Sequence, residues 1–290
     1  AANPPTGPSI HEIAAQGKEP EHLKEAEQLQ QEDAHDDMDG FPSSMFVGEV
    51  PDKTMTVTLA GTKASIHCIS PEFQHMFQGE GQVVWPSALS LAAWASTQPE
   101  LFRNKRVLEL GSGTGLCGIA VFRCLGARSV LLTDHDKDVL ELLARNAKLV
   151  LAESVAAAGG AGVTSALTDG TVQETAPVDA KYEVLDCAGV EWGRGGEQPS
   201  SGLTACTIPD SGYDVIVATD VVYGDGEFVL PLMETAFDKL SAGGTCYLAN
   251  HSIRFDVLER QVLDAAGAVG FEITRMPALP SLKELAASGA

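Results

Sequence analysis

Hydrophobic residues follow two alternating spacings along most of the chain. Short runs rich in Val, Ile and Leu, such as RVLEL and SVLLTD, are typical of buried strands, and the longer stretches between them carry apolar residues three or four positions apart, as helices do. This alternation predicts an α/β fold in which a mainly parallel sheet is covered by helices on both faces. The expected strands are 106–110, 129–134, 182–186, 213–220, 244–251 and 271–276, and the expected helices are 86–96, 115–126, 137–159, 226–240 and 255–270.

Composition divides the chain into segments of different character. Residues 1–40 carry ten acidic side chains against two lysines and few large apolar residues, which indicates an acidic N-terminal extension, with one helix predicted at 19–34. Residues 41–80 contain β-prone runs at 45–50, 55–61 and 64–70 and predict a small antiparallel layer. The main domain is expected at 81–280 and a C-terminal tail at 281–290. About 65 residues separate Asn146 from the strand at 213–220, so we expect an insertion at about 153–212.

Net charge limits the class of partner. Nineteen basic and forty acidic side chains give a formal charge of −21. An acidic surface repels a phosphate backbone, so we do not expect nucleic acid as a partner. The charge suits a basic protein segment or a cationic small molecule, and it is equally consistent with a role in solubility alone.

The cysteines and the apolar runs bear on the compartment. Six cysteines are scattered without a C-x-x-C pair, which predicts neither a zinc site nor a disulfide framework and favours a reducing compartment. No run approaches the roughly 18 apolar residues of a membrane span, so no membrane association is expected. The start AANPP lacks an initiator methionine, as methionine removal or cleavage of a transit peptide would leave it. We therefore expect the cytoplasm, with a mitochondrial or other organelle matrix as the alternative.

The stretch VLELGSGTGLCGIA (107–120) predicts a ligand-binding loop between a strand and a helix. Its glycines match the G-x-G-x-x-G fingerprint of dinucleotide-binding proteins, and Asp134 ends the next strand, where a carboxylate can hold a ribose. Glu109 distinguishes the two candidate cofactors, because a carboxylate repels a pyrophosphate but stabilises an ammonium and a sulfonium. The loop is therefore expected to bind S-adenosylmethionine, with Gly111 and Gly113 allowing close backbone approach. A nicotinamide dinucleotide is the competing ligand.

Five motifs occur in the order VVWPSALSLAAW, ELGSGTGLCGIA, LLTDHD, VEWG and ATDVVY. Together they resemble the seven-β-strand protein-lysine methyltransferases, and residues 91–116 look particularly like the elongation factor 2 lysine methyltransferases. The resemblance implies a Rossmann-like class I methyltransferase fold with a seven-stranded, mostly parallel sheet, and a protein lysine as the substrate. The residues that it implies at the cofactor are Trp85, Glu109, Gly111, Ser112, Gly113, Gly115, Asp134, Glu191, Trp192 and Thr219.

Within this set, the resemblance implies that Trp85 and Trp192 flank the cofactor and that Asp134 binds its ribose hydroxyls. Glu191 or Trp192 would meet the adenine. The chain has VEWG where LDWG is usual in the family, so Asp186 is the alternative adenine-side carboxylate. Thr219 also stands where alanine is usual.

Catalytic roles are expected for Asp220 and Tyr223, which follow the strand at 213–220. The Tyr223 ring would desolvate the incoming lysine, and Asp220 would orient its amine by accepting a hydrogen bond. No metal is expected, since the histidines lack metal-ligand spacing. The alternative function is a methyltransferase-like domain kept as a structural or interaction subunit of a larger assembly, which the acidic extension or the insertion would join.

Overall fold

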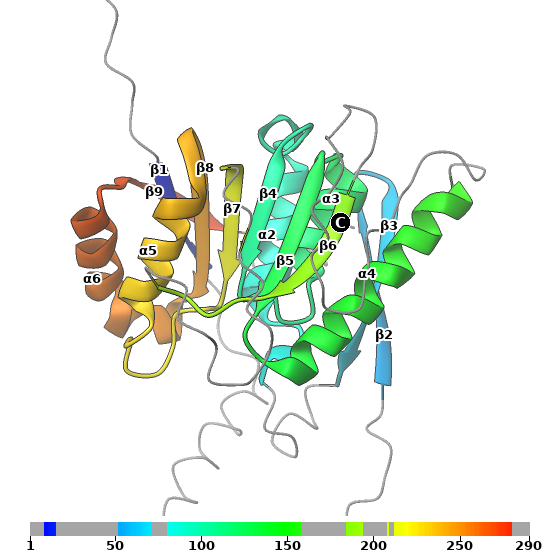
Figure 1. Ribbon diagram of the computed structural model, residues 1–290, viewed down its shortest axis with the longest axis horizontal. Coiled ribbons are helices and arrows are strands. Elements are labelled where there is room, and N and C mark those ends of the chain that lie inside the picture. Colours follow the sequence, from blue (N-terminus) through cyan, green and yellow to red (C-terminus); the bar gives the residue numbers. More distant parts are fainter. Residues whose placement is uncertain are drawn as a thin grey trace, which may run out of the picture.

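The computed structural model describes residues 9–15, 52–70, 80–157, 184–193, 208 and 212–279 (Figure 1). Its strands are β1 (Ser9–Ala15), β2 (Asp52–Leu59), β3 (Thr62–Ile69), β4 (Arg106–Leu110), β5 (Ser129–Asp134), β6 (Val184–Gly189), β7 (Tyr213–Thr219), β8 (Leu240–His251) and β9 (Glu272–Leu279). Its α-helices are α2 (Pro86–Ser96), α3 (Leu116–Leu125), α4 (Lys137–Ala157), α5 (Val229–Lys239) and α6 (Ser252–Val269), and two 3₁₀ turns are η3 (Glu80–Gln82) and η4 (Pro99–Leu101).

Seven strands form one sheet in the order β6-β5-β4-β7-β8-β1-β9, and the six pairings between neighbours are parallel. From β4 the chain adds β5 and β6 on one side of the sheet and then β7 and β8 on the other. The strand order therefore reverses between β4 and β7, and ligands of such sheets bind beyond the carboxyl ends of the strands at this point. The predicted Rossmann-like α/β fold is confirmed.

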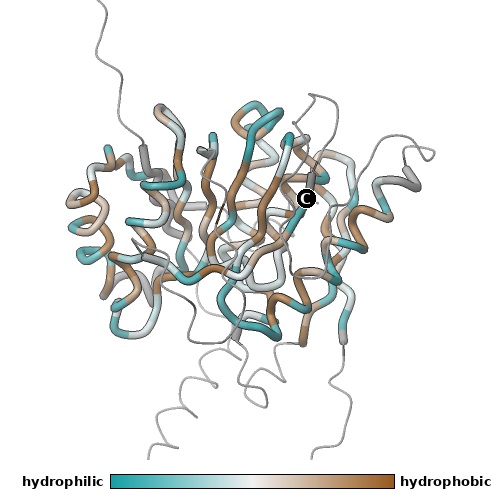
Figure 2. Tube along the Cα trace, viewed as in Figure 1, coloured by the Kyte–Doolittle hydropathy of each residue, from teal (hydrophilic) through white to brown (hydrophobic). Residues whose placement is uncertain are grey.

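Both faces of the sheet are buried, because successive side chains of each central strand enter different cores. Val107 and Val217 belong to the core shared with α2, α3 and α4, whereas Leu108 and Ile216 belong to the core shared with α5 and α6. Strands covered on both faces are expected to be apolar throughout rather than alternating. Figure 2 shows this as a hydrophobic centre, with hydrophilic residues at the loops and on the outer helices.

The hairpin of β2 and β3 forms a separate two-stranded antiparallel sheet that packs on α3 and α4 (Figure 1). Asn146 of α4, fully buried, joins this hairpin to the glycine loop. Its side chain accepts a hydrogen bond from the His67 N–H (2.7 Å) and donates to the carbonyls of His67 (2.9 Å) and Thr114 (2.8 Å). The predicted antiparallel layer thus supports the loop that follows β4.

The structure differs from the sequence expectation at Ser9–Ala15. These residues lie within the segment expected to be an acidic extension, yet they form β1, which pairs with β8 on one side and β9 on the other. The strand was not predicted because residues 1–40 are acidic overall and this seven-residue run has only two large apolar residues, Ile10 and Ile13. The strand forms hydrogen bonds to parallel neighbours on both sides, and these pairings cannot be inferred from the local sequence.

The other predicted elements recur with boundary differences of a few residues, and α2, β4 and β5 have the predicted bounds. The helix expected at 19–34, the run at 45–50, the tail at 281–290 and most of the insertion at 153–212 lie outside the described residues. Over the described part of the chain, no helix combines the length and apolar character that crossing a membrane requires.

Candidate active site

A cavity of about 760 Å³ opens where the strand order reverses, at the carboxyl ends of β4, β5 and β7. Ten of the twelve sequence-predicted site residues line it: Trp85, Gly111, Ser112, Gly113, Asp134, Glu191, Trp192, Thr219, Asp220 and Tyr223. Glu109 and Gly115 are not among the lining residues. Asp186 on β6 does not line the cavity either, so the geometry favours Glu191 over Asp186 as the adenine-side carboxylate.

The glycine loop after β4 is fixed by backbone hydrogen bonds and packs closely against the cavity wall. Gly111 has φ +65°, and a Cβ there would lie 2.6 Å from Val221 and 3.2 Å from the Trp192 ring, so a side chain would meet the cavity wall. The Ser112 N–H donates to the Thr133 carbonyl (2.8 Å), and the Gly113 N–H donates to Asp134 Oδ2 (3.0 Å). These bonds tie the loop to the end of β5, the next strand in the sheet.

Glu109 lies beneath the loop and is 1% exposed. Its Oε2 accepts a hydrogen bond from the Gly118 N–H (3.1 Å), and a Cβ at position 118 would lie only 2.5 Å from the same oxygen. Burial raises the pKa of Glu109 to about 8, against the lowering effect of its hydrogen bonds from Gly118 and Ser112. In this structure Glu109 therefore joins the end of β4 to the first turns of α3, and the proposed contact with a cofactor ammonium stays a prediction.

Replacing Glu109 with Gln is expected to make folding stability less dependent on pH. With a pKa near 8, the folded chain keeps a proton on Glu109 that the unfolded chain releases above its ordinary pKa of 4.5. The contribution of this group to stability is therefore largest below pH 4.5 and falls by up to about 1.4 kcal/mol per pH unit as the pH rises toward 8. Urea unfolding of both proteins at pH 5 and pH 8 measures this, because other groups titrate alike in the two. A difference in stability that is the same at both pH values would contradict the assignment.

Asp134 ends β5, is 8% exposed, and uses most of its acceptor capacity on the backbone. Oδ1 accepts from the N–H groups of His135 (2.8 Å) and Asp136 (3.2 Å), and Oδ2 accepts from Gly113 (3.0 Å). A carboxylate offers about four acceptor positions, so these three bonds leave one at Oδ2, and Asp134 lines the cavity. Asp134 thus fixes the glycine loop and keeps one position for a hydroxyl donor.

Asp220 joins three elements at the floor of the cavity. Its Oδ2 accepts from the Ser87 N–H (2.8 Å), and its Oδ1 accepts from the Ser87 hydroxyl (2.8 Å) and the His251 N–H (2.8 Å). The N-cap residue of α2 makes no side-chain capping hydrogen bond. The N–H of Ser87 in the first turn donates instead to Asp220, which follows β7 and lies 133 residues further along the chain. The backbone of Asp220 is left-handed, with φ +54°, a conformation that Asp tolerates better than most residues.

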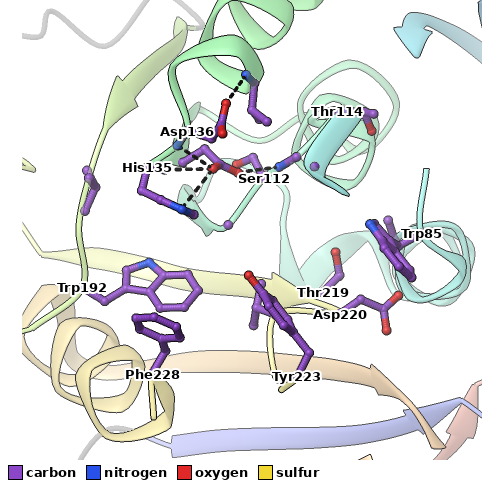
Figure 3. A pocket seen from close by; sticks show the side chains of 18 of the residues that line it. Trp85, Ser112, Thr114, His135, Asp136, Trp192, Thr219, Asp220, Tyr223 and Phe228 are labelled. Atoms are coloured by element: carbon purple, nitrogen blue, oxygen red, sulfur yellow. Dashed lines mark hydrogen bonds and ion pairs between the residues drawn. The ribbon is translucent and has the colours of Figure 1, made fainter. Parts of the chain in front are cut away.

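Aromatic side chains stand on opposite sides of this floor. Figure 3 shows Trp192 and Phe228 on one side, Trp85 on the other, and Tyr223 between them, near Thr219 and Asp220. The two tryptophans come from distant parts of the chain: Trp85 directly precedes α2, and Trp192 follows β6. The sequence-predicted tryptophans are thus brought to one cavity, on facing walls.

Sequence reasoning missed ten lining residues: Gly81, Val83, Ala88, Thr114, His135, Asp136, Val139, Val190, Val221 and Phe228. Several were within reach of the motifs, since His135 and Asp136 follow Asp134 directly and Val221 follows Asp220. Phe228 carried no local signal, because only the path of the loop after β7 returns it to the mouth of the cavity.

Part of this site lies in a segment that is similar to a known protein family. Residues 72–159, which include the glycine loop, Asp134 and α4, match a protein family described as lysine methyltransferase. This agrees with the resemblance that the sequence motifs carry.

Individual relatives align over limited parts of their length. The chain is 29% identical over 143 residues to the protein-lysine N-methyltransferase EEF2KMT of Mus musculus, an alignment that covers 49% of this chain and 35% of that protein. It is 29% identical over 182 residues to the protein N-lysine methyltransferase METTL21A of Danio rerio, covering 63% and 65% of the two chains. The chain thus spans about a third of the length of the mouse relative.

Among solved structures, the chain resembles a ribosomal protein L11 methylase from Lactobacillus delbrueckii. The TM-score is 0.35, with 20% sequence identity, and the match covers 60% of this chain and 66% of that one.

Proposed function

We propose that the chain is an S-adenosylmethionine-dependent methyltransferase that transfers a methyl group to a lysine side chain of a protein. One observation carries the proposal: the glycine loop after β4, Asp134 at the end of β5, and Asp220, Val221 and Tyr223 after β7 line the same cavity. The match of residues 72–159 to the lysine methyltransferase family and the names of the relatives support it.

The residues of the cavity fit this cofactor. A volume of about 760 Å³ lies within the range of small-molecule sites. Asp134 keeps one acceptor position at Oδ2 for a ribose hydroxyl, and Glu191 and Trp192 follow β6 on the side where the adenine would lie. Gly111 and Gly113 would hold the methionine part, with Thr219 beneath the methyl group. When bound, S-adenosylmethionine supplies an electrophilic methyl group on a sulfonium.

The chain's own residues would prepare the lysine. A lysine amine has an ordinary pKa of about 10.4, and only its neutral form attacks a methyl group. The rings of Tyr223 and Trp85 exclude water around the amine, which disfavours its charged form. Asp220 attracts the incoming cation and, through the acceptor position left at Oδ2, orients the amine. Alignment and exclusion of water are then the main contributions to the rate.

Competing functions are less well supported. An adenine methyltransferase acting on nucleic acid would carry an Asn or Asp followed by two prolines after the fourth strand, whereas this chain has DVVY and a charge of −21. An arginine methyltransferase would need two glutamates close together there, and only Glu227 is near. A domain kept as a structural or interaction subunit would keep the fold without a working site. We also propose the cytoplasm as its compartment, because the scattered cysteines of the sequence predict no disulfide framework.

Isothermal titration calorimetry with S-adenosylmethionine tests the cofactor assignment. We expect saturable one-to-one binding by the full chain and no measurable binding of NAD. The structural-subunit alternative predicts no binding of S-adenosylmethionine, and tight binding of NAD would overturn the assignment of the loop.

A further inference from the structure

The loop that leaves β7 carries the exposed hydrophobic surface of the described structure. Among described residues, the large hydrophobic side chains that are exposed are Tyr223 (41%), Phe228 (52%) and Leu230 (47%), all within eight positions. Tyr223 and Phe228 also line the cavity, and Leu230 lies in the first turn of α5, two residues beyond Phe228. Clustered exposed apolar side chains at the mouth of a cavity are typical of a binding surface.

The same loop is acidic. Asp225 and Glu227 are exposed and alternate with the apolar residues, and the Glu227 N–H donates to Asp225 Oδ1 (3.2 Å). Residues 212–238 contain six acidic side chains and no Lys, Arg or His. We call Tyr223, Asp225, Glu227, Phe228 and Leu230 the rim. Its carboxylates lie in a segment without cations of its own, so the charge is available to a partner.

Backbone hydrogen bonds and one buried side chain fix the position of the rim. The Gly226 N–H contacts the Tyr223 carbonyl (3.4 Å), the Val229 N–H donates to the Gly226 carbonyl (3.0 Å), and the Val229 side chain is buried in the core shared with α5 and α6. The rim side chains therefore project from a loop whose turns are closed by backbone hydrogen bonds. A preformed surface of this kind loses little conformational entropy when it binds.

We infer that the rim binds the protein segment around the target lysine, and that this segment is cationic and apolar, with at least one further Lys or Arg and one large apolar residue near the lysine. This inference rests on the proposed function, since the cavity beside the rim then receives the lysine itself. The rim carboxylates pair with the additional basic residue, while Phe228 and Leu230 cover the apolar one. Carboxylates at an exposed rim chiefly set the rate of association and its dependence on salt.

Synthetic peptides test this inference with the full chain saturated with S-adenosylhomocysteine. The probes are three fluorescein-labelled 15-residue peptides with one central lysine: one flanked by Arg and Leu, one with each Leu replaced by Ser, and one with each Arg replaced by Glu. Fluorescence anisotropy gives their dissociation constants at 50 and 300 mM salt. We expect the first peptide to bind about 10-fold more tightly than the other two at low salt.

Variants of the rim separate its two parts. The double variant Asp225→Asn/Glu227→Gln should weaken the Arg/Leu peptide about 5-fold at 50 mM salt and reduce its salt dependence. Leu230→Ser should weaken it about 5-fold at both salt concentrations. Glu141→Gln, an exposed carboxylate on α4, is the matched control and should leave binding unchanged.

The outcomes distinguish this inference from the proposed function. The substituted positions, namely Asp225, Glu227, Leu230 and the control Glu141, do not line the cavity, so S-adenosylmethionine affinity should be the same in wild type and the three variants. If wild type binds the cofactor but no peptide binds, or all three bind alike, the inference is overturned and the proposed function stands. Equal weakening by the Glu141 control would also overturn it. If wild type fails to bind the cofactor, the proposed function fails, whatever the peptides show.

Discussion

Replacing Asp220 with Asn is expected to reduce methyl transfer about 100-fold in a folded protein, the scale of loss that follows small misplacement of a reacting group. Asn tolerates the left-handed backbone at this position, where φ is +54°. Its amide lacks the charge, and its single oxygen offers about two acceptor positions, too few for the three donors from Ser87 and His251 together with an amine. Single-turnover transfer to a lysine-containing protein, measured beside a calorimetric titration with S-adenosylmethionine, checks this. Cofactor affinity should change by no more than about threefold, because the ribose contact that we propose is at Asp134.

Two companion variants separate catalysis from stability. Asp220→Ala should also melt earlier, because a left-handed alanine costs about 1 to 2 kcal/mol and three hydrogen bonds to the carboxylate are lost. Tyr223→Phe should lose less transfer than Asp220→Asn, since the ring that excludes water stays. Near-normal turnover per folded molecule in Asp220→Asn would show that Asp220 only ties α2 to β7 and β8.

Replacing Asp134 with Ala is expected to weaken S-adenosylmethionine binding about 10- to 150-fold, the equivalent of about 1.5 to 3 kcal/mol for a hydrogen bond to a charged group. The carboxylate would bind a ribose hydroxyl at Oδ2 while its other acceptor positions hold the N–H groups of Gly113, His135 and Asp136. Its loss therefore removes a ligand contact and loosens the glycine loop. Titration calorimetry on folded protein measures the effect.

Asp138→Ala is the control for this variant, because Asp138 is exposed in the first turn of α4 and does not line the cavity. Its cofactor affinity should equal that of wild type. Unchanged affinity in a folded Asp134→Ala protein would remove Asp134 from the binding site.

The order of strands and helices was predictable wherever one strongly apolar run was bounded by clear turn residues. The helix Pro86–Ser96 shows this best, since Pro86 occupies the first helical position, where its missing N–H costs nothing, and the predicted bounds recur in α2. The chain also places Asp134 at the end of a strand and Gly111 and Asp220 directly after strands, so a parallel sheet brings them to one edge. Local sequence was sufficient here because each residue follows its own strand.

Contacts between distant segments could not be predicted in this way. The sequence around Ser87 and Asp220 does not show that Asp220 caps α2, because the contact depends on how α2 crosses the end of β7. Glu109 was assigned to a ligand from its charge alone, whereas its burial beneath the loop depends on the approach of Gly118 in α3. Strand β1 was missed for a related reason, since its pairing partners lie more than 200 residues away.

The central claim is most directly tested by identifying the residue that receives the methyl group. The full chain is incubated with cell lysate and tritiated S-adenosylmethionine, the labelled protein is hydrolysed, and the labelled amino acid is separated by chromatography. We expect label in methyl-lysine, strongly reduced when Asp220→Asn replaces wild type. Label in methyl-arginine or nucleic acid, or no label above a lysate without added enzyme, would contradict it.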